Sequence, residues 1–199
     1  MEKKNVGILL FKDVETLDFA GPFEVFSVTG QRSGEGNFNV FTIAKDKSPV
    51  LAINGLSINP HYTMDDCPHM DILVIPGGYG TRALLNEQYY INWVLDKSKE
   101  AELVLSVCTG SLLLAKAGLL TGLKATTHHQ CLDLLAGLDP SIRIKRERFA
   151  DNGHIMTAAG IAAGIDMSLY VVGKLVGNAV AEETAKHMEY PYWDIEIFE

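Results

Sequence analysis

Apolar residues along this chain form two kinds of segment that follow one another in turn. Short runs rich in β-branched and aliphatic residues predict buried strands, and they cover residues 6–11, 38–44, 71–75 and 103–107. Longer segments with apolar residues at helical spacing predict helices, and they cover residues 19–28, 87–99, 109–120, 129–135, 161–176 and 179–188. This alternation predicts an α/β sandwich with a mainly parallel central sheet flanked by helices.

Residues typical of tight turns predict two β-hairpins in addition to these strands and helices. The dipeptides Asn54-Gly55 and Asn152-Gly153 each separate two short apolar stretches, and Asn-Gly in that position predicts a β-hairpin. A further short strand is predicted at residues 125–128. No repeat, low-complexity segment or linker interrupts the pattern, so we expect one domain over residues 1–199.

Composition and charge argue against two kinds of partner, nucleic acids and membranes. The 199 residues are 47% hydrophobic and 21% charged, which is typical of a globular domain. The net charge is −8, and the densest basic segment, residues 143–148, alternates like a strand with one solvated face; we therefore expect no nucleic-acid partner. No apolar run approaches the roughly 20 residues of a membrane span, so we expect no membrane partner.

The cysteines point to a reducing compartment. Cys67, Cys108 and Cys131 do not make a disulfide framework, and the first residues do not resemble a secretory signal. We therefore expect a cytoplasmic location. No CxxC or HExxH spacing occurs, so we expect no metal site.

Cys108 carries the strongest chemical signal. It follows the predicted strand 103–107, and only Thr109 and Gly110 separate it from a Leu- and Ala-rich helix. A cysteine at such a strand-to-helix elbow lies over the helix N-terminus, where free N–H groups and the helix dipole favour the thiolate. Hydrolase elbows present their nucleophiles by the same turn. The alternative is a buried structural cysteine that behaves as a small hydrophobe.

Asp18 is the candidate acid. It follows the first predicted strand, so in a parallel sheet it lies at the same edge as Cys108. Taken alone it is read as the N-cap of the helix over 19–28, with Pro22 in the first turn. Beside a thiolate, burial and like charge would raise its pKa and let it act as general acid. Glu15 is an alternative carboxylate in the same loop.

The segment Pro76-Gly77-Gly78 ends another predicted strand at this edge. Glycine turns are common, but here missing Cβ atoms would let backbone N–H groups approach a developing negative charge. Gly77 and Gly78 thus predict an oxyanion site, completed by the N–H of Thr109. The Thr109 hydroxyl is interpreted equally well as a helix cap or as a group that positions water or substrate.

Histidines near the elbow are the remaining candidates. His128 could partner the nucleophile or bind substrate, or it could be an ordinary satisfied polar residue; a direct role for the adjacent His129 is less favoured. Cys67 and Cys131 are interpreted as inert.

These pieces together resemble the ThiJ/PfpI superfamily, which has the class I glutamine amidotransferase-like (flavodoxin-like) fold. The residues that carry the resemblance are 17–22 (Leu-Asp-Phe-Ala-Gly-Pro), 76–78 (Pro-Gly-Gly), 106–110 (Ser-Val-Cys-Thr-Gly), 125–128 (Ala-Thr-Thr-His) and 157–166 (Thr-Ala-Ala-Gly-Ile-Ala-Ala-Gly-Ile-Asp). Within the superfamily the chain looks most similar to isocyanide hydratases and to the amidase-like domains of some transcriptional regulators.

The resemblance implies specific roles. Cys108 would be the nucleophile, Asp18 its acidic partner, and Thr109 a group that helps hold the attacking water. Gly77 and Gly78 would line the oxyanion site, and the protein would be a homodimer. Protease-like members carry His after the nucleophile, where this chain has Thr109, so protease activity is not implied.

Three functions follow as hypotheses. The first is a cofactor-independent enzyme of small electrophiles, most concretely an isocyanide hydratase that forms N-substituted formamides. The second is a non-catalytic redox or stress sensor, or a regulator-type domain, that uses Cys108. The third is amidase, hydrolase or glyoxal-type aldehyde chemistry at the same thiol. The aromatic residues Tyr190, Tyr192, Trp193 and Phe198 are interpreted as core cover, a dimer contact or a pocket lid.

Overall fold

The computed structural model describes residues 3–31, 34 and 36–190. Within this part of the chain the central sheet is built from β1 (Lys4–Leu9), β2 (Phe38–Ala44), β5 (Tyr62–Thr63), β6 (Ile72–Ile75), β7 (Leu103–Val107), β10 (Phe149–Asp151) and β11 (Ile155–Ala158). The strand order is β10-β11-β7-β6-β1-β2-β5. All neighbours are parallel except β10 and β11, which form an antiparallel hairpin.

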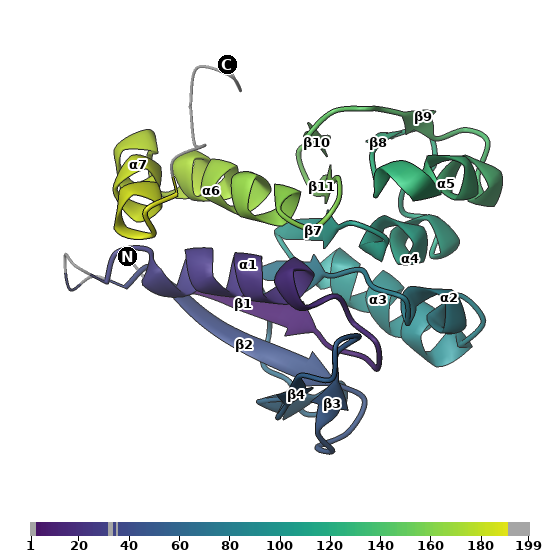
Figure 1. Ribbon diagram of the computed structural model, residues 1–199, viewed down its shortest axis with the longest axis horizontal. Coiled ribbons are helices and arrows are strands. Elements are labelled where there is room, and N and C mark those ends of the chain that lie inside the picture. Colours follow the sequence, from purple (N-terminus) through teal and green to yellow (C-terminus); the bar gives the residue numbers. More distant parts are fainter. Residues whose placement is uncertain (1–2, 32–33, 35, 191–199) are drawn as a thin grey trace.

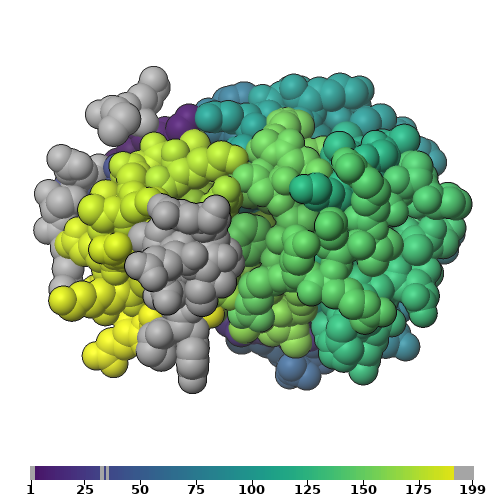
Figure 2. All heavy atoms as spheres, turned by 90° about the horizontal axis from the view of Figure 1, so that it is seen from above, coloured from purple at the N-terminus to yellow at the C-terminus, as the bar shows by residue number. Residues whose placement is uncertain are grey.

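Helices form a layer on each face of this sheet (Figure 1). They are α1 (Thr16–Val28), α2 (Thr81–Leu84), α3 (Gln88–Glu100), α4 (Gly110–Lys116), α5 (Leu132–Leu138), α6 (Ala163–Leu175) and α7 (Asn178–His187). α1 and α7 pack against α6, whereas α3 and α5 pack against α4. Figure 2 shows α7, in yellow, at one end of the molecule and the green residues around the β10–β11 hairpin towards the other.

Two small sheets lie outside the central one. β3 (Val50–Leu51) and β4 (Ser57–Ile58) form the predicted hairpin around Asn54-Gly55. β8 (Lys124–Ala125) pairs in parallel with β9 (Arg143–Ile144). The hairpin around Asn152-Gly153 is the β10–β11 pair.

The sheet order confirms the predicted fold class. The strands β2, β1, β6, β7 and β11 follow the 2-1-3-4-5 order of doubly wound, flavodoxin-like sheets. All residues of β6 and β7 are buried, because helices cover both faces of these central strands. Each fully buried Leu or Ile side chain there contributes about 2 kcal/mol of transfer free energy.

The first helix differs from the prediction. α1 begins at Thr16 with Glu15 at the N-cap position, so Asp18 lies in the first turn and is not the cap. Pro22 consequently lies inside the helix rather than in its first turn, and its missing N–H leaves the Asp18 carbonyl without the usual i+4 donor. This longer helix carries the Asp18 carboxyl inward, where the side chain is fully buried.

Other boundaries shift by a few residues. α4 ends at Lys116 instead of continuing to residue 120, and the segment predicted as a helix over 129–135 starts as a 3₁₀ turn, η1 (His129–Cys131), before α5. No helix of the described residues has the length and apolar character required to cross a membrane. Of the aromatic tail only Tyr190 belongs to the described part; Tyr192, Trp193 and Phe198 lie outside it.

A substitution at Gly110 tests how tightly the elbow between β7 and α4 is packed. A Cβ placed on Gly110 would lie 2.0 Å from the Ile75 carbonyl oxygen, which is a backbone atom that cannot move without displacing β6. We therefore expect Gly110→Ala to lower the free energy of unfolding by at least about 2 kcal/mol, measured by urea denaturation. Gly137→Ala is the matched control, because nothing lies within 4 Å of its added Cβ and helix propensity favours alanine. Equal stability of the two variants would contradict this packing.

Candidate active site

Cys108 occupies a strained backbone position between β7 and α4. Its φ is 54°, in the left-handed region that non-glycine residues rarely adopt. The surrounding structure holds it there: the Cys108 N–H donates to the Ala159 carbonyl at 2.8 Å, and the Thr127 hydroxyl donates to the Cys108 carbonyl at 2.8 Å. Strain of this kind costs about 1–3 kcal/mol and persists where neighbouring contacts impose it. The predicted elbow is present.

Asp18 lies beside this elbow in a dry environment. Its Oδ2 accepts a hydrogen bond from the Gly77 N–H at 3.0 Å, while Oδ1 is buried and has no hydrogen-bond partner of ordinary geometry among the described residues. Burial raises the pKa of Asp18 to about 7; the Gly77 N–H lowers it, the charge of Glu15 raises it, and the Cys108 thiol lowers it. A carboxyl group with this pKa exchanges protons near neutral pH.

The thiol shows the opposite of the predicted thiolate character. Burial raises the pKa of Cys108 to about 12, and the negative charge of Asp18 raises it further. The N–H groups of Thr109 and Ile161 act on the sulfur in the other direction and lower its pKa. The net direction is therefore opposite to the one predicted from the helix N-terminus, because the loss of solvation outweighs the two N–H groups. At neutral pH these values favour the thiol form of Cys108 and divide Asp18 between carboxyl and carboxylate.

Thr109 connects the elbow to the glycine turn. It stands at the N-cap position of α4, but its side chain does not cap the helix. Instead its hydroxyl accepts from the Gly78 N–H at 3.0 Å and from the Thr81 hydroxyl at 3.1 Å. It lies 3.1 Å from the Gly78 carbonyl, to which it donates. The hydroxyl therefore fixes the geometry of the turn.

The glycine turn does not have the arrangement predicted for an oxyanion site. The Gly77 N–H donates to Asp18 and the Gly78 N–H donates to Thr109, so both are already used within the protein. The glycines are needed for close packing: a Cβ on Gly77 would lie 2.5 Å from the Thr109 nitrogen, and one on Gly78 would lie 2.4 Å from the Glu15 nitrogen. The N–H groups that face the sulfur are those of Thr109 and Ile161.

Ile161 is the site residue that sequence reasoning missed. Its φ is 50°, although a β-branched side chain is strained in this region. The segment 157–166 is one of those that carry the family resemblance, but the identity of an isoleucine does not predict a positive φ. Only the position of this turn above Cys108 reveals that its N–H points to the thiol.

His128 lies next to the site without contacting the thiol. Its Nδ1 accepts from the Gln130 N–H at 3.3 Å. Its ring contacts the tilted ring of His129 at 4.3 Å between centroids, and no hydrogen bond joins it to Cys108. Burial lowers the pKa of His128, and the neighbouring His129 and Arg82 lower it further. These effects favour the neutral imidazole. The side chain of His128 forms part of the wall of a neighbouring pocket.

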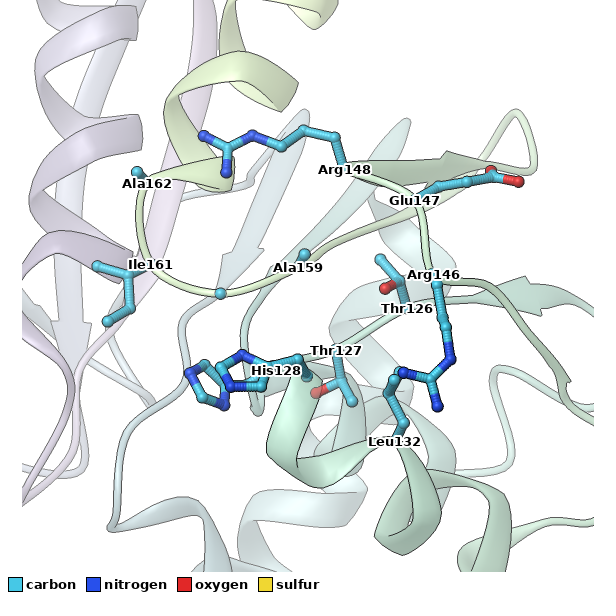
Figure 3. Close-up of a pocket in the computed structure, with 12 residues that line it drawn as sticks. Thr126, Thr127, His128, Leu132, Arg146, Glu147, Arg148, Ala159, Ile161 and Ala162 are labelled. Atoms are coloured by element: carbon cyan, nitrogen blue, oxygen red, sulfur yellow. The ribbon is translucent and has the colours of Figure 1, made fainter.

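That pocket is a cavity of about 430 Å³ beside the elbow, within the range of small-molecule sites. Figure 3 shows its walls. They consist of Thr126, Thr127, His128, His129, Leu132, Arg146, Glu147, Arg148, Ala159, Gly160, Ile161 and Ala162. Thr127, Ala159 and Ile161 also act directly on Cys108, so the cavity and the thiol share their walls.

The other predicted residues lie apart from the thiol. Cys67 is half-buried and Cys131 is buried, and both are free. The Cys131 sulfur accepts a hydrogen bond from Arg82 at 3.5 Å. Among the described residues no three His, Cys, Asp or Glu side chains gather in a way that could hold a metal ion.

With this geometry established, comparison with known proteins identifies the family. The family model described as "DJ-1/PfpI family" matches residues 4–174. The chain belongs to the DJ-1/PfpI family. A protein named isonitrile hydratase from Pseudomonas putida is 37% identical over 185 residues, which cover 93% of this chain and 78% of that protein.

Two further relatives show the breadth of the family. The crystal structure of a ThiJ/PfpI family protein from Pseudomonas syringae superimposes with a TM-score of 0.87 at 31% identity, covering 98% of this chain and 78% of the other. The HTH-type transcriptional regulator GbdR from Pseudomonas aeruginosa is 26% identical, and the match covers 94% of this chain and 51% of the regulator. The chain thus spans about half of that regulator. The DJ-1/PfpI fold therefore occurs in relatives named as enzymes and as regulators.

The interaction between carboxyl and thiol is directly testable. Asp18→Asn removes the negative charge that raises the pKa of Cys108, so thiolate should form at lower pH in the variant. We expect the midpoint of Cys108 alkylation by iodoacetamide, followed by peptide mass spectrometry, to fall by at least about one pH unit. Glu15→Gln is the control, because Glu15 acts on Asp18 and is not among the groups that shift Cys108. A midpoint that is unchanged or higher in Asp18→Asn would show that the two groups do not interact.

Proposed function

We propose that this protein is a cysteine-dependent enzyme that hydrates isocyanides to N-substituted formamides. The observation that carries the proposal is the buried pair of Cys108 and Asp18, in which each group changes the pKa of the other. The 37% identity to a protein named isonitrile hydratase supports the reaction class. The substrate is a small molecule, and the steps below need only the thiol, the carboxyl and water.

The first step adds the thiol across the terminal isocyanide carbon. The sulfur of Cys108 forms a bond to that carbon while its proton passes to the Asp18 carboxylate. Asp18 then delivers the proton to the same carbon, which gives a thioimidate, R–N=CH–S–Cys. A carboxyl group with a pKa of about 7 suits both transfers, because it is neither a strong acid nor a strong base at neutral pH. Because burial raises the pKa of Cys108, we assign the attack of the sulfur and the loss of its proton to the same step.

The second step releases the product. Water bonds through oxygen to the thioimidate carbon as Asp18 accepts one of its protons and passes it to the nitrogen, which gives R–NH–CH(OH)–S–Cys. The carbon–sulfur bond then breaks as the hydroxyl proton passes through Asp18 to the sulfur, and R–NH–CHO leaves. The sum is isocyanide plus one water to formamide. We assign Thr109 a positioning role here, since its hydroxyl holds the turn on which Gly77 and Gly78 face the site.

The homodimer and the cytoplasmic location stay predictions. Exposed apolar side chains on and beside the β3–β4 hairpin suit a subunit contact: Leu51 and Leu56 are each 50% exposed, and Ile53 is 40% exposed. Their clustering on one projection is compatible with the expected dimer.

Redox sensing is the less favoured alternative. Relatives that act as regulators keep it open, but sensor cysteines are low-pKa and accessible. Burial raises the pKa of Cys108, and only 6% of its surface is exposed. Both properties argue against ready oxidation of the resting thiol.

Steady-state hydration of 4-nitrophenyl isocyanide tests the proposal. Cys108→Ala should lower kcat/KM at least about 10³-fold because it removes the nucleophile, and Asp18→Asn about 10²-fold because it removes the proton carrier. Cys67→Ala is the matched control and should retain full activity, since its thiol lies in a separate loop. Undiminished turnover in Cys108→Ala would refute the mechanism.

The pH profile supplies a second test. Below a pH of about 7 the Asp18 carboxyl is protonated and no longer accepts the thiol proton, so kcat/KM should fall as pH decreases through this value. Glu15→Gln removes a charge that raises the pKa of Asp18, and the midpoint should move to lower pH. A profile that is flat between pH 5 and 9, or that falls with increasing pH, would contradict the role given to Asp18.

A further inference from the structure

The cavity beside Cys108 is positively biased in a protein whose net charge is −8. Arg146 and Arg148 both line it, together with the acidic residue Glu147. Anions are repelled by the protein as a whole, so a local excess of positive charge in a cavity that shares walls with the surroundings of Cys108 calls for an explanation.

The charges of the cavity are not all compensated. Glu147 pairs with Lys145 at 3.6 Å, and in Figure 3 its side chain extends away from the Arg146 guanidinium, which descends towards Leu132. Arg148 donates through Nε to Asp166, whose other oxygen accepts from the Tyr190 hydroxyl at 2.9 Å.

Arg146 alone lacks a counter-charge. It forms neither an ion pair nor a hydrogen bond with any residue in the described part of the chain, and its side chain is exposed to the cavity. A guanidinium offers five N–H donors in a planar fork that matches a carboxylate bidentately. A single unpaired guanidinium matches the charge of one anionic ligand group that carries a single negative charge.

The remaining walls define the rest of the ligand. Leu132, Ile161, Ala162 and the Cβ of Ala159 add apolar surface to the walls, and two of these residues, Ala159 and Ile161, also act on Cys108. A volume of about 430 Å³ accommodates a short apolar body. The cavity therefore fits a molecule with an apolar centre and an anionic end.

We propose that the substrate carries a carboxylate, which Arg146 binds while the reactive carbon is directed to Cys108. This inference rests on the proposed function for the identity of the reactive group, but the anion site itself rests on the cavity alone. Arg146 is thus a specificity-determining residue, and Arg148, held by Asp166, is a rigid part of the same wall.

Paired substrates test the selectivity. The protein should hydrate 4-isocyanobenzoate with a kcat/KM about tenfold above that for its neutral methyl ester, because a charge-assisted bidentate contact forms only with the acid. Arg146→Gln should lose about tenfold with the acid and less than about twofold with the ester. Arg143→Gln is the matched control: this arginine lies three residues earlier, on β9, and contacts the Gly122 carbonyl outside the cavity. Equal rates for acid and ester, with no effect of Arg146→Gln, would overturn the proposal and leave isocyanide hydration intact.

A binding measurement separates this proposal from the failure of the reaction. Calorimetry with Cys108→Ala should show 4-formamidobenzoate, the corresponding product, binding about tenfold more tightly than its methyl ester, and addition of Arg146→Gln should abolish the difference. This result is expected even if no isocyanide is hydrated, which would refute the proposed function and keep the anion site. Equal affinity for both compounds would refute the anion site.

Discussion

Burial of a carboxyl group beside a thiol is the interaction on which the site depends. Neither Asp18 nor Cys108 is solvated, and each therefore favours its neutral form. Because ionisation of one opposes ionisation of the other, the two groups share protons as a unit. Burial of these two polar groups lowers the stability of the protein at neutral pH, and a well-packed apolar pair in their place would make it more stable. The cost is typical of sites where a raised carboxyl pKa is used for chemistry.

The fold makes this pairing possible through the order of its strands. β1, β6 and β7 are neighbours, and the segments that follow them carry Asp18, in the first turn of α1, Gly77 and Cys108 respectively. In a parallel sheet these segments converge at one edge, at the point where the strand order reverses. Close approach requires glycine at positions 77 and 110, where a Cβ would collide with the backbone of a neighbouring loop.

Two strained residues face each other across the site. Cys108 and Ile161 both have positive φ, and Cys108 donates its N–H to the carbonyls of Ala158 and Ala159 while the Ile161 N–H is directed at its sulfur. The turn after β11 thus holds the elbow and also forms the wall of the cavity. Nucleophile and pocket are parts of one structure, so a substitution in the turn affects both.

The amino-acid sequence by itself determined the α/β class, the two Asn-Gly hairpins, the elbow at Cys108 and the place of Asp18 at the same sheet edge. These follow from periodicity and from residues whose local preferences are strong. Only the tertiary structure decided the protonation of the pair, because solvation depends on what the other loops bury. It also decided that the N–H groups of Gly77 and Gly78 bond to Asp18 and Thr109, that Ile161 faces the thiol, and that Arg146 lines a cavity without a counter-charge among the described residues. Each of these depends on contacts between residues tens of positions apart, which no local pattern encodes.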